Sequence, residues 1–301
     1  MAHNKHIIDH ANKDVDQLAL YGISSRQEAK EYYLSLIPDG YKSPYPDPVV
    51  ETYDGIRVVR DDLITGTKVR GGDVLASMTN ASTLVYVQPR VGLAGVSLLD
   101  VAQKRNKKVM LFMPSSKRIS KHQACCIERG CEYDFHRIAA MPNLNSIAKK
   151  YADKHDDAFF IPLGLKHELV TAGVVAAASK IKEPEEVWTV VSTGVLHRAL
   201  QIAWPNAKFN AVAVARNMKQ GEVGHGNIIS APEAFQQDIK ESEMPPFPTV
   251  TSYDGKAWRY IPKNSGKDIL FWNVGTEPVL NDDKLYDTID SYREWPKNVV
   301  E

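Results

Sequence analysis

Short apolar runs alternate with amphipathic runs along most of the chain. The apolar runs are rich in Val, Ile, Leu and Phe, as in buried parallel strands, and the runs between them repeat apolar residues at helical spacing. This alternation predicts parallel sheets covered by helices on both faces. The predicted strands are 56–63, 83–88, 107–114, 131–138, 209–216 and 268–275, with a strand followed by a turn at 158–164. The predicted helices are 25–37, 69–79, 97–106, 116–130, 146–156 and 171–181, and 187–200 combines a strand, a glycine turn and a helix.

Three stretches lack this pattern. Residues 1–45 are polar apart from the helix predicted at their end, and the run PDGYKSPYPDP that follows this helix breaks regular structure, so we expect an N-terminal arm that packs on the main body. Residues 217–248 are rich in Gly and Pro and predict a loop with one short helix near 232–240. Residues 251–261 predict a turn around their central Asp-Gly pair.

Composition and charge narrow the class of protein. A chain of 301 residues with 43% hydrophobic and 25% charged residues is ordinary for a globular protein of one large or two average domains. The formal net charge is zero, so no overall field attracts nucleic acid or a membrane surface. The sequence contains no apolar run of the roughly 20 residues that a membrane span needs, and its first residues do not predict a secretory signal.

The three cysteines, Cys125, Cys126 and Cys131, lie close together in the sequence. An odd, clustered set predicts reduced thiols and a cytoplasmic location. His122 and His136 lie nearby, but the spacing matches no standard zinc pattern, so we expect no metal site.

The stretch ITGTKVRGG, residues 64–72, carries the first candidate chemistry. It follows a predicted strand that ends in two acids, and Lys68 comes after a Thr-Gly turn, at the start of a predicted helix. A neutral lysine amine can form a Schiff base with an aldehyde, and pyridoxal 5′-phosphate (PLP) is a cofactor that binds in this way. On this stretch alone, a solvated lysine in a first helical turn is the favoured interpretation of Lys68, because a lone Gly-x-Lys is a weak signal.

Five segments between residues 59 and 280 match, in the same order, segments of one enzyme family. On these segments the chain resembles the tryptophan-synthase-like, fold type II PLP enzymes, and most closely the branch of ACC deaminase and D-cysteine desulfhydrase. The matching segments are VRDDLITGTKVRGGDVL (59–75), IPLGLKHELVTAGVVAAASKI (161–181), VSTGVLHRAL (191–200), TSYDGKAW (251–258) and ILFWNVGTEPVL (269–280).

The resemblance implies a fold and a reaction type. The fold would be α/β, with two domains of three α/β/α layers, mainly parallel sheets and PLP in the cleft between the domains. Residues 1–76 and 161–301 would form the large, PLP-binding domain, and residues 77–160 would form the small domain. The enzyme would be a homodimer that forms an external aldimine with an amino acid or amino-acid-like small molecule and breaks a bond at Cα, as a deaminase or lyase does.

The resemblance also assigns roles to individual residues. Lys68 would be the Schiff-base lysine, and Asp254 would face the pyridine nitrogen, since the alternative partner position is the apolar Val274. Tyr253 would lie near the cofactor and act in acid–base chemistry. From the residues alone, Asp254 could instead be a turn residue and Tyr253 a half-buried aromatic. The phosphate of PLP would be held by a glycine turn before a helix, a known type of phosphate site, made by Ser192, Thr193, Gly194, Val195 and Leu196.

One segment departs from the family pattern. The family has Ser-Asn-His after its second strand, to contact the cofactor ring and the substrate carboxylate, where this chain has Val91, Gly92 and Leu93. Gln88 and Arg90 are then the candidate substrate-binding residues, because a guanidinium suits a carboxylate.

The altered loop leaves two further hypotheses open. The first is a PLP-dependent decarboxylase or tailoring enzyme that acts on an amino-acyl-modified substrate such as a nucleobase, the one case in which nucleic acid would be a partner. The second is a protein of this fold that binds PLP without catalysis, which the presence of Lys68 disfavours.

Overall fold

The computed structural model describes most of the chain and divides it into two compact units. The smaller unit contains Leu75–Leu165 and the described residues from Pro278 onward, and the larger unit contains the described residues before Leu75 together with Lys166–Glu277. The sequence places the last segment, from 278, in the large domain instead. The N-terminal arm predicted for 1–45 is described only from Ser25. The described residues are 25–137, 141–215, 218, 222–282, 284–285 and 289.

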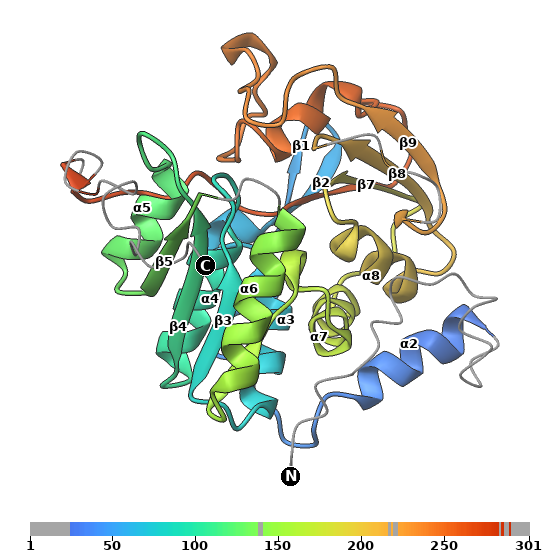
Figure 1. Ribbon diagram of the computed structural model, residues 1–301. Helices are drawn as coiled ribbons and strands as arrows, with labels where there is room; N and C mark the ends of the chain where they lie inside the picture. The colour runs from blue at the N-terminus through green and yellow to red at the C-terminus, as the bar shows by residue number, and fades with distance from the viewer. Residues whose placement is uncertain are drawn as a thin grey trace. The chain divides into compact units, whose positions relative to one another are not determined.

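The larger unit contains a six-stranded sheet in the order β1-β2-β10-β7-β8-β9 (Figure 1). All neighbouring strands are parallel except β1 and β2, which form an antiparallel pair. Asp54 and Gly55 both have positive φ at the turn between these two strands, as a tight hairpin requires. The strands are β1 (Val50–Tyr53), β2 (Ile56–Arg60), β7 (Glu186–Val191), β8 (Lys208–Ala213), β9 (Asn227–Ser230) and β10 (Ile269–Asn273).

The two faces of this sheet have separate hydrophobic cores. Side chains alternate between the faces, so that Val59, Leu270 and Trp272 pack under the helices, whereas Val58 and Phe271 pack on the opposite side. The helices over the first face are α2 (Arg26–Ser35), α7 (Glu168–Ala178) and α8 (Val195–Ala203). The opposite face is covered by the segment around the 3₁₀ helix η6 (Asp254–Tyr260), with Phe247, Trp258 and Ile261.

Helix α3 (Lys68–Met78) packs against α7 in direct backbone contact. A Cβ atom on Gly71 would lie 2.6 Å from Cα of Val170, and one on Gly173 would lie 2.6 Å from Cα of Gly71. Only glycines allow helices to approach this closely, because any side chain would separate them. This contact fixes the first turn of α3, where Lys68 lies.

The smaller unit contains a parallel four-stranded sheet in the order β5-β4-β3-β6 (Figure 1). Val85, Val87 and Phe112 on one face pack with Leu144 and Ala148 of α6. The alternate positions of the same strands point to the other face, and α4 packs against α5 and against β3 and β4. The elements are β3 (Thr83–Val87), α4 (Ala94–Lys104), β4 (Lys108–Pro114), α5 (Lys121–Glu128), β5 (Glu132–His136), α6 (Met141–Lys154) and β6 (Ala158–Phe160).

The predicted α/β class with parallel sheets and helices on both faces is therefore confirmed. The structure differs from the sequence predictions in several local features. Strands β1 and β9 were not predicted, residues 232–240 contain no helix, and the predicted turn around Asp254 is the 3₁₀ helix η6. The end of the first predicted strand is the 3₁₀ helix η2 (Asp61–Leu63).

Two further observations concern the described residues. None of their helices is both long and apolar enough to cross a lipid bilayer. All three cysteines are buried and take part in no disulfide. Burial raises the pKa of the Cys126 and Cys131 thiols, so both are protonated and poorly nucleophilic at neutral pH.

Candidate functional site

The candidate residues of the larger unit follow the carboxyl ends of three adjacent parallel strands. Lys68 comes after β2, Val274 comes directly after β10, and Ser192 comes directly after β7. Because β10 lies between β2 and β7, these three chain segments leave the sheet at the same edge. Ligands of open parallel sheets bind at this edge.

Lys68 is the first residue of α3 and has a half-buried side chain. The surrounding protein desolvates the ammonium and lowers the pKa of Lys68 to about 8. A lysine with this pKa has a substantial neutral fraction near neutral pH, and the neutral amine is the nucleophilic form. Lys68 is therefore not a fully solvated lysine with an ordinary pKa.

The turn before Lys68 is held by the buried carboxylate of Asp61. Asp61 is fully buried and accepts hydrogen bonds from the Thr67 hydroxyl at 2.7 Å and from Nη2 of Arg70 at 2.5 Å. Nε1 of Trp272, on β10, donates to the same carboxylate and to the Thr67 hydroxyl, both at 2.9 Å. The charge of Arg70 compensates the buried carboxylate. These bonds connect β2, β10 and the start of α3.

A continuous series of hydrogen bonds leads from the residue before Lys68 to Asp254. The Thr67 amide donates to the carbonyl of Val274 at 2.8 Å, and the Val274 amide donates to Oδ2 of Asp254 at 2.8 Å. The Val274 side chain cannot hydrogen bond, but its backbone fixes the carboxyl group of Asp254.

Asp254 is completely buried, and its second oxygen, Oδ1, has no hydrogen-bond partner among the described residues. Burial raises the pKa of Asp254 well above its usual value, and the nearby Asp61 and Asp62 raise it further. Burial therefore favours the protonated, neutral form of this carboxyl group. A buried polar atom without a partner is costly, so Oδ1 is a candidate for contact with a ligand.

Tyr253 connects Asp254 to the turn after β7. Its hydroxyl lies 3.2 Å from Oγ of Ser192, and its ring is half-buried. Burial raises the pKa of Tyr253, and the nearby Asp254 contributes in the same direction, so the phenol stays protonated and can donate a proton.

The turn itself has the geometry expected of an anion cradle. Gly194 precedes α8 in a left-handed conformation, with φ of 74° and ψ of 0°. The first amides of a helix lack intrahelical acceptors, and the helix dipole makes this end positive. The half-buried side chains of Ser192 and Thr193 precede it, and Val195 and Leu196 supply the amides of the first turn.

Gln88 and Arg90 belong to the smaller unit, where they follow β3. Gln88 is fully buried, and its amide donates to the carbonyls of Pro89 at 2.9 Å and Gly92 at 3.0 Å. Its Oε1 accepts from the Gly95 amide at 2.8 Å. Gln88 therefore shapes the loop before α4, whereas Arg90 is half-buried and retains accessible surface.

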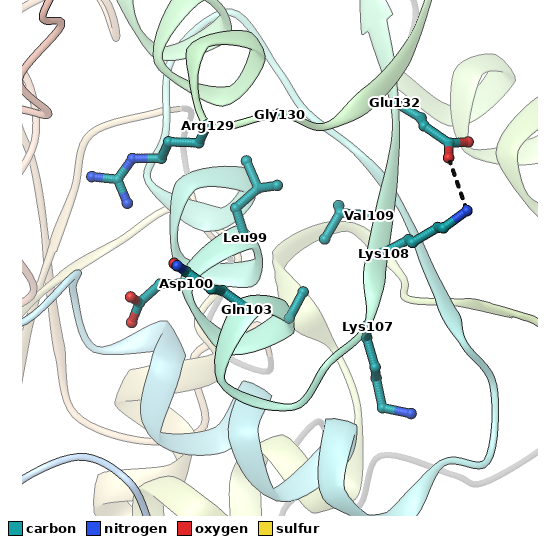
Figure 2. A pocket seen from close by; sticks show the side chains of 10 residues that line it. Leu99, Asp100, Gln103, Lys107, Lys108, Val109, Arg129, Gly130 and Glu132 are labelled. Atoms are coloured by element: carbon teal, nitrogen blue, oxygen red, sulfur yellow. Dashed lines mark ion pairs between the residues drawn. The ribbon is translucent and has the colours of Figure 1, made fainter.

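A separate hollow of about 640 Å³ lies in the smaller unit between α4, the start of β4 and the α5–β5 turn (Figure 2). Leu99 and Val109 line it with apolar surface. Lys108 and Glu132 form an ion pair of 3.8 Å beside it, and Arg129 points away from this pair. These polar groups do not converge on one point, so the hollow does not resemble a catalytic site. Among the residues that the structure describes, no group of His, Cys, Asp and Glu is arranged to hold a metal ion.

Sequence reasoning did not identify Asp61, Trp272 or Arg198 as parts of the site. In the sequence, Asp61 is one of two acids at the end of a predicted strand, with nothing to mark it as buried. Arg198 is almost fully buried although it lies in the first half of α8. A charged residue at an apolar position of a helix is the signal that could have identified it.

No protein-family model and no curated protein matches this sequence. Solved structures match nearly the whole chain. An ACC deaminase homologue is 16% identical with a TM-score of 0.69, and the match covers 87% of this chain and 99% of that chain. Threonine deaminase isoform 2 from Solanum lycopersicum is 14% identical (TM-score 0.61, 88% of each chain), and serine racemase from maize is 12% identical (TM-score 0.62, 94% and 98%). The chain thus has the fold type II architecture that the sequence segments predict.

Proposed function

We propose that this protein is a PLP-dependent enzyme that acts at Cα of an amino acid or amino-acid-like small molecule, as a deaminase or lyase. The observation that carries the proposal is the hydrogen-bonded series from Thr67, beside Lys68, through Val274 to Asp254. It joins a lysine of lowered pKa to a buried carboxyl group with one unsatisfied oxygen. The names of the structural neighbours, a homologue of ACC deaminase, a threonine deaminase and a serine racemase, support chemistry on small amino acids.

The residues fit the chemical groups of PLP. The aldehyde needs a neutral amine, which Lys68 supplies. The phosphate needs backbone amides and hydroxyls at a glycine turn, which residues 192–196 supply. The pyridine nitrogen needs a polar partner away from water, and Oδ1 of Asp254 is a buried oxygen with no other partner among the described residues. Lys68, residues 192–196 and Asp254 all belong to the larger unit.

In this proposal each residue has a distinct task. Bound PLP supplies an electron sink for the bond that breaks at Cα. Lys68 would hold the aldehyde carbon covalently, and its amine would be the group that a substrate amine has to replace at that carbon. Asp254 would hold a proton between Oδ1 and the pyridine nitrogen, and the ion pair formed there would favour the protonated ring. Tyr253, protonated and bonded to Ser192, would donate or accept a proton at its hydroxyl.

The proposal is tested by reconstitution with PLP. The purified protein should gain a visible absorption band with PLP, and borohydride should fix the cofactor to the chain. Peptide mass spectrometry should then place the modification on Lys68. Lys68→Ala should show neither the band nor the modification. As a matched control, Lys107→Ala removes another lysine whose pKa is lowered by burial and should leave both unchanged. A protein that binds no PLP, or that is modified equally at Lys107, would refute the proposal.

One observation favours a second candidate function. The Ser-Asn-His of the family is replaced by Val91, Gly92 and Leu93, and the side chain of Gln88 is fully used within its own loop. Arg90 is then the remaining side-chain candidate for a substrate carboxylate. A decarboxylase or tailoring enzyme for an amino-acyl-modified substrate, such as a modified nucleobase, would not need the missing donors. Release of carbon dioxide rather than ammonia from such a substrate would distinguish the two.

We further propose a homodimer in the cytoplasm, on the resemblance and on three buried cysteines that form no disulfide. Light scattering of the purified protein gives the mass directly. A monomer at micromolar concentration would contradict the dimer.

A further inference from the structure

Arg198 lies directly behind the glycine turn that precedes α8. Its side chain is only 3% exposed. Nη1 donates to the carbonyl of Thr193 at 3.1 Å and also to the carbonyl of Glu222. A Cβ atom added to Gly194 would lie 2.6 Å from the same nitrogen, so the guanidinium occupies the space that a side chain at Gly194 would take. The sequence assigned no role to this residue.

These contacts place the guanidinium on the carbonyl side of the turn. A nitrogen that bonds the carbonyl of Thr193 lies on the side of the peptide opposite to the amide of Gly194, because N–H and C=O of a trans peptide point in opposite directions. The amides at the start of α8 are then free to face a ligand on the other side. The carbonyl of Glu222 is held at the same nitrogen, so the turn is joined to the segment before β9.

From this geometry we infer that Arg198 is a positioning residue for the phosphate group of the cofactor. It holds the carbonyls of Thr193 and Glu222 behind the turn, which orients the amides of residues 194–196 toward an anion, and it adds a buried positive charge behind them. A positive charge in protein surroundings acts on an anion more strongly than one in water. The inference rests on the proposed function, because it assumes that the turn binds the phosphate of PLP.

Comparing PLP with pyridoxal tests whether Arg198 acts on the phosphate or on the whole site. Pyridoxal has the same aldehyde and ring as PLP but no phosphate. Both compounds would bind through Lys68, and only PLP would use the turn. Arg198→Met keeps most of the buried stem but removes the donors and the charge. We expect the affinity for PLP to fall by about tenfold to a hundredfold, as for loss of hydrogen bonds to a charged group, and that for pyridoxal to change less than about twofold.

Arg198→Lys keeps the charge, but its shorter side chain places the nitrogen further from the two carbonyls that Nη1 of Arg198 holds, so its PLP affinity should lie between those of the wild type and Arg198→Met. Gln201→Met is the matched control. Gln201 lies one turn further along α8 and holds the carbonyls of Val223 at 3.0 Å and His225 at 2.7 Å, without contacting Thr193. Gln201→Met should leave the ratio of PLP affinity to pyridoxal affinity unchanged. Thermal melts of each variant check folding, and Arg198→Lys provides the measurement if Arg198→Met does not fold.

The outcomes separate the inference from the proposed function. In one outcome, the wild type binds PLP on Lys68 and the Arg198 variants have the same ratio of PLP affinity to pyridoxal affinity as the wild type. This result would overturn only the role of Arg198. The same loss of PLP affinity in Gln201→Met would also overturn it, since the segment from Glu222 would then be the cause. Wild-type protein that binds neither compound would overturn both proposals.

Discussion

The backbone amide of Val274 donates a 2.8 Å hydrogen bond to Oδ2 of Asp254, and the other oxygen of this carboxyl group, Oδ1, has no partner among the described residues. One oxygen is therefore fixed and the other is available. A carboxyl group held in this way in a buried position can present a proton to a basic ring nitrogen with a defined direction. This relationship gives Asp254 its place in the proposed mechanism and leads to the first prediction.

Asp254→Asn should keep the shape of the site and much of the PLP binding but lose the proton shared with the ring nitrogen. Loss of a charge-assisted hydrogen bond costs on the order of 1.5–3 kcal/mol, and each 1.4 kcal/mol is about tenfold in rate. We expect turnover to fall by roughly tenfold to a few hundredfold, measured as kcat with saturating PLP. Asp268→Asn, which breaks a partly exposed ion pair with Arg57, is the control and should retain full activity.

The substitution Asp254→Asn should also raise the stability of the cofactor-free protein. Because burial raises the pKa of Asp254, the folded state keeps the proton to a higher pH than the unfolded state, in which this carboxyl group ionises above about pH 4. Its contribution to stability therefore falls as pH rises from the unfolded pKa toward the folded pKa. Thermal melts of Asp254→Asn and wild type should diverge over this range, with the variant more stable at neutral pH. If the difference in melting temperature between Asp254→Asn and the wild type is the same at pH 4 and at pH 7, the pKa of Asp254 is not raised.

The rate of covalent PLP capture should increase with pH through about 8. Burial lowers the pKa of Lys68 to about 8, so the nucleophilic neutral amine is half formed there rather than near the value of about 10.4 for a solvated lysine. Stopped-flow absorbance after mixing with PLP measures the rate. A rate that continues to rise beyond pH 9 would contradict the lowered pKa. Lys68→Arg should show no covalent capture at any pH.

Gly194→Val should weaken PLP binding and also destabilise the fold. The left-handed φ of 74° disfavours a β-branched residue, and its Cβ would lie 2.7 Å from the carbonyl of Glu222. We expect a loss of about 1–3 kcal/mol in unfolding free energy and at least about tenfold in PLP affinity. Denaturant melts and PLP titration measure the two effects. PLP affinity equal to that of the wild type would place the phosphate elsewhere.

Gly71→Ala tests the backbone contact of α3 with α7. The added methyl group would lie 2.6 Å from Cα of Val170, so the two helices must separate. Overpacking of this kind costs about 1–3 kcal/mol, and the separation should also shift Lys68 and slow PLP capture. Ser77→Ala, at an exposed position of the same helix, is the control and should change stability by less than about 0.5 kcal/mol. Wild-type stability of Gly71→Ala would show that the helices are not in contact.

ACC and D-cysteine should be poor substrates. The loop after β3 has Val91, Gly92 and Leu93 in place of the polar residues that the family uses for the substrate carboxylate. Ammonia release from each compound, measured beside a known ACC deaminase, tests this expectation. Turnover of either compound at a rate similar to that of the reference enzyme would show that the loop does not decide the substrate.

The sequence by itself determined the α/β class, most of the strands and helices, and the candidate residues of the larger unit. Local patterns suffice for this, because a buried parallel strand is a short apolar run and an amphipathic helix repeats every 3.6 residues. Lys68 and Gly194 could be identified because each lies in a segment that keeps the order of the family. The hairpin of β1 and β2 also has a signal in the sequence, because Asp54-Gly55 is a strong turn dipeptide.

Only the tertiary structure decided the chemical state and the surroundings of these residues. Burial by distant segments raises the pKa of Asp254, and Asp61 and Asp62, which are also distant in sequence, raise it further. Trp272 donates a hydrogen bond to Asp61, which lies 211 positions away in the sequence. The proposed positioning role of Arg198 depends on the carbonyls of Thr193 and Glu222, which only the folded chain brings to its guanidinium. Gln88 turned inward to satisfy the backbone of its own loop. Burial and hydrogen bonding between distant segments control these properties, and neither leaves a periodic pattern in the chain.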